Sequence, residues 1–141
     1  MIHLDTSVLV DALTGPRRSS QLLRELMGGP EQVSISSFVL FEWFRGPRLK
    51  EEIEAQEALF PKADASAFGP LEAQIAAGLY KTVKRARGRE GDLAVAACAL
   101  ANGASLWTLN PKDFDDVPDL TLLDPSAERI GSPQKPPFRG Q

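Results

Sequence analysis

The feature that most constrains this chain is an alternation of short apolar runs with longer stretches of helical periodicity. Met1–Leu4, Val33–Ser36 and Ser105–Leu109 are short and β-like, and the segments between them carry apolar residues at helical spacing. Pro61–Ala65 and Leu120–Leu123 are further candidates for short strands. Such alternation is typical of βαβ units, in which helices cover a parallel sheet. The pattern therefore predicts an α/β domain.

Six helices are expected from apolar spacing and from residues that start or stop helices. The first includes Val8-Leu9-Val10, after the capping side chains of Asp5-Thr6-Ser7. The stretch with the most aromatic residues is also open to a strand interpretation, but the serines before it can cap a helix and Gly46-Pro47 can stop one. The long alanine-rich helix near the C-terminal third must be buried on most sides. The other predicted helices are Ser19–Met27, Phe38–Phe44, Glu51–Phe60, Phe68–Arg87 and Leu93–Ala101.

Length and charge limit the classes of protein that fit. A chain of 141 residues is enough for one domain with one core, and we expect that domain to span residues 1–125. The remaining residues, 126–141, are rich in proline and glycine and predict a flexible tail. The net charge of −3 requires any nucleic-acid contact to come from a local basic patch. Cys98, the single cysteine, is expected to be buried.

No apolar run approaches the length of a membrane span, and the N-terminal residues lack the basic start of a signal peptide. The chain is therefore expected to act in the cytoplasm, without a membrane partner.

Four acidic residues stand far apart in the sequence but at comparable places in the predicted fold. Asp5 follows the first strand, Glu42 lies inside an apolar helix, Asp92 opens the alanine-rich helix, and Asp113 follows the Ser105–Leu109 strand. Because the carboxyl ends of parallel strands share one edge of a sheet, these carboxylates can converge there. Carboxylate oxygens suit hard divalent cations, so the four acids predict a metal site.

Each acid also has a simpler explanation. Asp5 can cap a helix, Asp92 can favour the positive end of a helix dipole, and Asp113 can belong to a solvated acidic loop. Glu42 is harder to explain, since its neighbours from Phe38 to Phe44 are apolar, although Arg45 offers a partner three residues away. Together these explanations leave the recurrence at strand ends unexplained, and the metal interpretation accounts for it.

Four segments in order then resemble PIN-domain ribonucleases, in particular VapC toxins of toxin–antitoxin pairs. The resemblance runs from about Met1 to Leu123. The segments are Ile2-His3-Leu4-Asp5-Thr6-Ser7-Val8-Leu9, Phe41-Glu42-Trp43, Gly91-Asp92-Leu93-Ala94-Val95-Ala96-Ala97 and Leu106-Trp107-Thr108-Leu109-Asn110-Pro111-Lys112-Asp113-Phe114.

The resemblance implies a three-layer α/β/α fold with a five-stranded parallel sheet, and RNA cleavage with Mg²⁺ or Mn²⁺. It implies that Asp5, Glu42, Asp92 and Asp113 hold the metal, with either Asn110 or Asp113 as the fourth metal-facing residue. Thr6, Thr108 and Asn110 would orient ligands or a water molecule. It also implies tRNA or rRNA as substrate, a homodimer, and restraint by a VapB-like antitoxin, for which the apolar residues from Phe38 to Phe44 would suit a docking groove.

A basic run just before Asp92 is the candidate RNA-binding surface. Basic helix ends are usually solvated surface, but this one precedes the expected metal site. His3 is the only histidine and is expected to be structural, so metal-activated water, leaving a 5′-phosphate, is the expected route. The basic residues are Lys81, Lys84, Arg85, Arg87 and Arg89.

Two other classes of protein are weighed against the nuclease. A phosphoaspartate protein also places Asp after its first strand, but the second acid that such proteins carry beside it is absent here: Ser7 stands where a dehalogenase-like phosphatase has Asp. The alternative that stays open is a catalytically silent PIN-like module for protein or RNA interaction.

Overall fold

The computed structural model describes residues 1–125. Three parallel strands form its sheet: β1 (Ile2–Leu4), β2 (Val33–Ser34) and β3 (Ser105–Trp107), in the order β2-β1-β3. Ile2 lies opposite Val33 on one side and Ser105 on the other. The predicted tail, residues 126–141, lies outside the described part of the chain, so the domain boundary at residue 125 stays a prediction.

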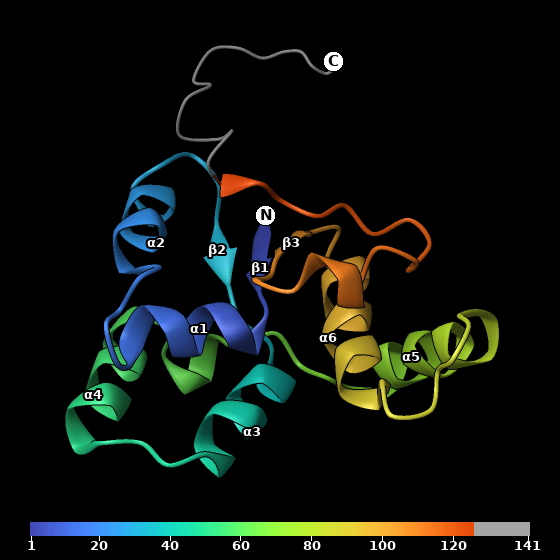
Figure 1. Ribbon diagram of the computed structural model, residues 1–141, viewed down its shortest axis with the longest axis horizontal. Coiled ribbons are helices and arrows are strands. Elements are labelled where there is room, and N and C mark those ends of the chain that lie inside the picture. Colours follow the sequence, from blue (N-terminus) through green and yellow to red (C-terminus); the bar gives the residue numbers. More distant parts are fainter. Residues whose placement is uncertain (126–141) are drawn as a thin grey trace.

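Helices lie on both sides of this sheet, so the predicted α/β/α layering is confirmed. Figure 1 shows α2 and α4 to one side of the strands and α5 and α6 to the other, with α1 crossing near the ends of the strands. The α-helices are α1 (Thr6–Leu13), α2 (Ser20–Met27), α3 (Ser37–Arg45), α4 (Lys50–Leu59), α5 (Pro70–Thr82) and α6 (Glu90–Ala101), and two 3-10 turns are η1 (Lys62–Asp64) and η2 (Pro111–Asp113).

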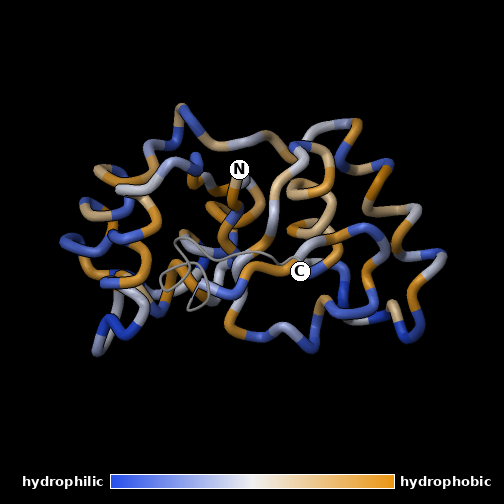
Figure 2. Tube along the Cα trace, turned by 90° about the horizontal axis from the view of Figure 1, so that it is seen from above, coloured by the Kyte–Doolittle hydropathy of each residue, from blue (hydrophilic) through white to orange (hydrophobic). Residues whose placement is uncertain are grey.

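Helix α6 is the buried centre of one layer. Every residue from Leu93 to Ala99 is buried, Cys98 included, as expected for a helix that is apolar on all faces. Figure 2 shows the hydrophilic positions gathered at the outer turns of the trace, which leaves the inner elements to form one core. The largest side chains in that core are Trp43, Trp107 and Phe114.

The aromatic segment is a helix, as predicted. Ser36 caps α3 by accepting a hydrogen bond from the Val39 backbone N–H at 3.2 Å, and Gly46 follows its last residue. Val39, Leu40 and Trp43 are buried, whereas Phe41 and Phe44 are exposed. Within residues 1–125, no helix combines the length and hydropathy needed to cross a bilayer.

The sheet has three strands in the described residues, where five were expected. At the positions of the two missing outer strands there are isolated parallel bridges, Ser36 to Ser66 and Leu106 to Leu122. After Pro61 the chain turns through η1, so only Ser66 reaches the edge of the sheet. On the other edge the backbone of Asp119 is left-handed, and pairing is limited to the residues around Leu122.

Two helix boundaries also differ from the prediction. The long amphipathic helix ends at Thr82 rather than near Arg87, because the hydroxyl of Thr82 bonds the carbonyls of Gly78 and Leu79 and Arg85 adopts a left-handed backbone. Helix α6 begins at Glu90, so Asp92 lies within its first turn instead of before it. Of the basic run, Lys81 alone therefore lies on α5, and the others precede α6.

Candidate functional site

Asp5 is held in place by three hydrogen bonds at the end of β1. Its Oδ1 accepts from the Thr6 backbone N–H at 2.9 Å, which caps α1 as the sequence suggested. Its Oδ2 accepts from the hydroxyls of Ser7, at 2.9 Å, and Thr108, at 2.7 Å. Only 7% of Asp5 is exposed. The three hydrogen bonds fix the orientation of this buried carboxylate.

Ser7 is a site residue that sequence reasoning missed. Its hydroxyl donates to Asp5 and accepts from the Leu109 backbone N–H at 3.1 Å, while the Thr108 hydroxyl accepts from Asn110 N–H at 3.0 Å. These bonds join the start of α1 to the turn after β3. The only signal was the local Asp-Thr-Ser sequence, which indicates helix capping and says nothing of the contact with Leu109.

Glu42 reaches the site from α3. Its Oε1 accepts a hydrogen bond from the Thr6 hydroxyl at 2.5 Å, and Oε2 lies 3.6 Å from a guanidinium nitrogen of the exposed Arg45. The predicted pair with Arg45 is therefore present. A Cβ added to Gly91 would lie 3.2 Å from Glu42 Oε2, which is tighter than an ordinary contact. Glycine at the second position of α6 thus lets the Glu42 carboxylate approach the residue beside Asp92.

Asp92 shows that the four predicted acids are close enough to interact. Its pKa is raised from 3.8 to about 6, first by burial and then by the negative charges of Asp5, Asp113 and Glu42, with Arg89 acting in the opposite direction. A carboxyl group is disfavoured in its ionised form by lost hydration and by like charges nearby. The site therefore carries electrostatic repulsion that a bound cation would relieve.

Asp113 and Asn110 lie on the turn after β3, and both are exposed. Asp113 ends η2, and its carbonyl accepts a hydrogen bond from Arg89 at 3.0 Å. Within residues 1–125, no three His, Cys, Asp or Glu side chains are already arranged as a closed metal-binding group. Asp5, Glu42 and Asp113 therefore interact with Asp92 through their charges.

The basic residues divide into two groups. Lys81, Lys84, Arg85 and Arg87 are exposed on or just after the end of α5. Arg89 is different, because its guanidinium is engaged by Asp116 and by backbone carbonyls. His3, in β1, is 1% exposed, with its Nε2 3.4 Å from the Ser66 hydroxyl, and burial lowers its pKa to about 4.

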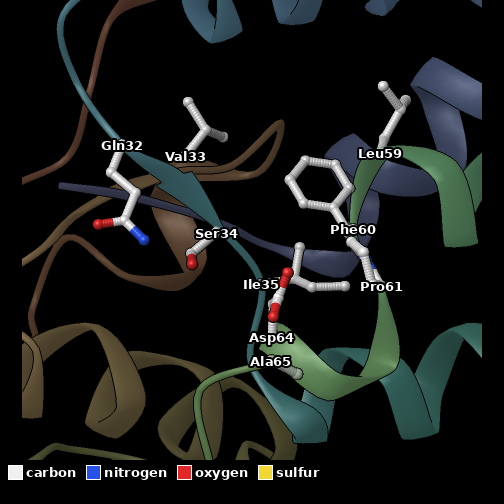
Figure 3. Close-up of a pocket in the computed structure, with 9 residues that line it drawn as sticks. All are labelled: Gln32, Val33, Ser34, Ile35, Leu59, Phe60, Pro61, Asp64 and Ala65. Carbon is white, nitrogen blue, oxygen red and sulfur yellow. The ribbon is translucent and has the colours of Figure 1, made fainter.

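The acid cluster lies outside the pockets that border β2 and α6. One pocket, of about 300 Å³, opens between β2 and the chain after α4 (Figure 3), where none of the four acids contributes to its wall. The other, of about 410 Å³, is apolar and borders the first turn of α6, with Phe38, Phe68, Tyr80 and Gly91 among its lining residues. Of the four acids, Asp5 is buried, Glu42 and Asp92 are partly buried and Asp113 is exposed.

This chain is similar to known proteins over most of its length. Residues 2–120 match the family model of the PIN domain. The chain is 33% identical over 119 residues to the ribonuclease VapC19 of Mycobacterium tuberculosis, covering 83% of this chain and 94% of that protein.

Several solved structures are similar to this chain over nearly the same length. The VapBC2 structure from Rickettsia felis, bound to a DNA fragment from its promoter, is 25% identical with a TM-score of 0.69, covering 87% of this chain and 98% of that one. DNA-bound VapBC from Salmonella typhimurium has a TM-score of 0.73 at 18% identity, covering 88% and 97%, and shows likeness of fold.

Proposed function

The chain belongs to the PIN-domain family, in its VapC-type branch, and from this membership and the acid cluster we propose that it is an endoribonuclease, the toxin of a VapBC-type pair. The observation that carries the proposal is the raised pKa of Asp92, caused after burial by Asp5, Asp113 and Glu42. Acids that only cap helices need not lie near one another. Acids from four separate elements that bind one cation must lie close together.

The cation we propose is Mg²⁺ or Mn²⁺, held by Asp5, Glu42, Asp92 and Asp113. The residues fit such an ion because every donor is a carboxylate oxygen and because Gly91 leaves room for Glu42 where a Cβ would crowd it. When bound, the ion supplies charge neutralisation at the phosphate and lowers the pKa of water near it. The fourth position is proposed for Asp113, with Asn110 beside it on the same turn.

Hydroxyl groups of this chain orient two of the four carboxylates. Thr108 and Ser7 hold Asp5, and Thr6 holds Glu42, so two carboxylates are oriented by hydroxyl groups before any ligand arrives. Such supporting hydrogen bonds typically change metal affinity or activity by about 10–100-fold when removed. His3 is buried and neutral, so it has neither the position nor the charge to protonate a leaving group. Attack by water, leaving a 5′-phosphate, is therefore the route that the residues support.

RNA is the proposed substrate, with structured RNA such as tRNA or rRNA suggested by the family. Exposed positive charge is provided by Lys81 near the end of α5 and by Lys84, Arg85 and Arg87 in the turn before α6, on the chain that leads to Asp92. Phosphate contacts of this kind position a nucleic acid without reading its bases.

A VapB-like protein is the proposed partner, and a homodimer is the proposed assembly. The VapBC relatives are complexes by their names. Phe41 and Phe44 leave apolar surface on α3 beside Glu42, at 54% and 41% exposure. A partner that covers this surface would also cover the acid cluster, which is how we propose that inhibition works.

The test is RNA cleavage by protein purified free of any antitoxin. We expect cleavage of total RNA with Mn²⁺ or Mg²⁺, loss of cleavage with EDTA, and a fall of at least about 100-fold in Asp92→Asn. Asp115→Asn, an exposed acid outside the cluster, is the matched control and should keep full activity. Full activity in Asp92→Asn would show the site assignment to be wrong. If folded wild-type protein cuts no RNA but binds it, the silent interaction module is the better interpretation.

A further inference from the structure

Arg89, the residue just before α6, donates hydrogen bonds from both terminal nitrogens of its guanidinium. One terminal nitrogen, Nη1, donates to Asp116 Oδ2 at 2.9 Å and to the Lys84 carbonyl at 3.0 Å. The other, Nη2, donates to Asp116 Oδ1 at 2.7 Å and to the Asp113 carbonyl at 3.0 Å. Only 19% of its side chain is exposed. One guanidinium thus joins the turn after α5, the start of α6 and the turn that carries Asp113.

From these contacts we infer that Arg89 is a positioning residue, which together with Asp116 holds Asp113 beside Asp92. This inference rests on the proposed function of the acid cluster. Asp92 belongs to the first turn of a rigid buried helix, whereas Asp113 belongs to a short exposed 3-10 turn. The buried side chain of Phe114 anchors this turn in the core on one side of Asp113, and a tie to the start of α6 would fix Asp113 itself relative to Asp92. Arg89 supplies that tie through the Asp113 backbone, which leaves the Asp113 carboxylate free for a ligand.

The same contacts argue against the predicted role of Arg89 in binding RNA. A guanidinium has five N–H donors, and the four on its terminal nitrogens are all used here. Its charge is neutralised by a two-point pair with Asp116, whose pKa is lowered chiefly by the hydrogen bond from Arg89. A phosphate would have to break this pair to reach Arg89, whereas the exposed Arg87 is available two residues earlier.

Removal of Arg89 should change the affinity of the acid cluster for a divalent cation. The direction of the change depends on whether Arg89 acts through its charge or by positioning Asp113. Its positive charge lies near Asp92 and Asp113, so loss of the charge alone should make the acid cluster bind a divalent cation more tightly. Loss of positioning should make binding weaker, because Asp113 no longer keeps its place. The sign of the change in cation affinity therefore distinguishes the two effects.

We suggest measuring Mn²⁺ affinity by calorimetry, without RNA, for the wild type, Arg89→Met, Arg89→Lys and Asp116→Asn. Positioning predicts that Arg89→Met weakens Mn²⁺ binding by about tenfold. Asp116→Asn should also weaken it, Arg89→Lys should recover part of the loss, and the double variant Arg89→Met/Asp116→Asn should be no worse than Arg89→Met. Lys50→Met on α4 and Asp115→Asn beside Asp116 are the controls for loss of one charge, with Mn²⁺ affinity expected to stay within twofold.

A second measurement needs no metal. In the metal-free protein, amide hydrogen exchange at Asp113 and Phe114 should quicken by at least about tenfold in Arg89→Met and Asp116→Asn, while the interior of α6 keeps its protection. Equal or tighter Mn²⁺ binding, or unchanged exchange at Asp113 and Phe114, overturns the inference. A wild-type protein that binds no Mn²⁺ overturns the proposed function instead, and the exchange result then decides alone whether Arg89 holds the turn.

Discussion

The hydroxyl of Thr108 donates a 2.7 Å hydrogen bond to Asp5 Oδ2 and so joins two residues that are 103 positions apart. Thr108 follows β3 and Asp5 follows β1, and these strands are neighbours in the sheet. The bond therefore exists only because parallel pairing brings the two strand ends together. It fixes the carboxylate whose position the rest of the acid cluster depends on.

Replacing Thr108 by valine should remove this bond while preserving shape. We expect cleavage to slow by about tenfold and the free energy of unfolding to fall by about 1–2 kcal/mol, because Asp5 loses one of its three hydrogen bonds. Single-turnover cleavage and urea unfolding measure the two effects. Thr108→Ser keeps the hydroxyl and should keep most of the activity; an equal loss in both variants would show that the methyl group matters and the hydrogen bond does not.

Gly91→Ala should disturb the site without weakening the fold. The added Cβ lies 3.2 Å from Glu42 Oε2 and 3.6 Å from a ring carbon of Phe38, so the carboxylate must shift by a few tenths of an ångström. We expect cleavage to fall by about tenfold, since small displacements of catalytic groups are costly.

Gly78→Ala is the matched control for that change. Gly78 lies inside α5, and a Cβ there meets no atom within 4 Å. Alanine should raise stability by about 0.5–1 kcal/mol through helix propensity and leave cleavage unchanged. If both alanine variants cleave RNA normally, close approach of Glu42 to Gly91 has no functional importance.

Asp92→Asn should stabilise the metal-free protein at neutral pH while it abolishes cleavage. The ionised carboxylate is disfavoured first by burial and then by Asp5, Asp113 and Glu42, and the amide removes that repulsion. Since Asp92 is only partly buried, we expect a gain of about 1 kcal/mol in the presence of EDTA. Thermal or urea unfolding checks this, with Asp115→Asn as control, and a destabilised Asp92→Asn contradicts the electrostatic account.

The pH dependence of stability should change in the same variant. The pKa of His3 is lowered from 6.5 to about 4, chiefly by burial and then by the N-terminal charge. The contribution of the neutral imidazole to the free energy of unfolding is therefore complete above pH 6.5 and is lost as the pH falls toward 4. The pKa of Asp92 is raised from 3.8 to about 6, so its contribution is lost as the pH rises through the same window. These two contributions oppose each other in the wild type.

Metal-free Asp92→Asn should therefore lose more stability than the wild type when the pH falls from 6.5 to 4.5. The extra slope should be about 0.5 kcal/mol per pH unit, which spreads the expected difference of about 1 kcal/mol over the window between pH 3.8 and about 6. His3 is the only histidine, so its single ring resonance gives an independent check by nuclear magnetic resonance. A titration midpoint near 6.5 in the folded protein contradicts the predicted shift.

Lys84→Met and Arg87→Met should weaken RNA binding without affecting Mn²⁺ affinity. Both residues are exposed at the turn before α6, and removing one phosphate-binding charge should reduce the slope of log K against log salt by about 0.7 for single-stranded RNA. Binding measured at several salt concentrations in EDTA tests this. Lys50→Met, on α4, is the control, and equal slopes in all of these proteins would assign RNA binding to another surface.

Much of the fold was predictable because its signals are local. Ser36 before an apolar run and Gly46 after it indicated α3, and the uniformly apolar stretch after Asp92 indicated a buried helix. The outer strands were less predictable, since a single bridge at Ser66 or Leu122 depends on how the chain meets the sheet edge. The end of α5 was misplaced because nothing in the local periodicity indicates the left-handed backbone at Arg85.

By itself the sequence determined that this chain forms an α/β domain with candidate acids on separate elements, because periodicity, capping and residue type act over a few positions. Only the tertiary structure decided which side chains form hydrogen bonds or ion pairs with the acidic residues of the chain. Thr6 meets Glu42 across 36 residues, and Arg89 meets Asp116 across 27. Such pairs form where separate elements pack together, so only the folded protein shows that Arg89, a predicted RNA contact, donates to Asp116 and to the Asp113 carbonyl.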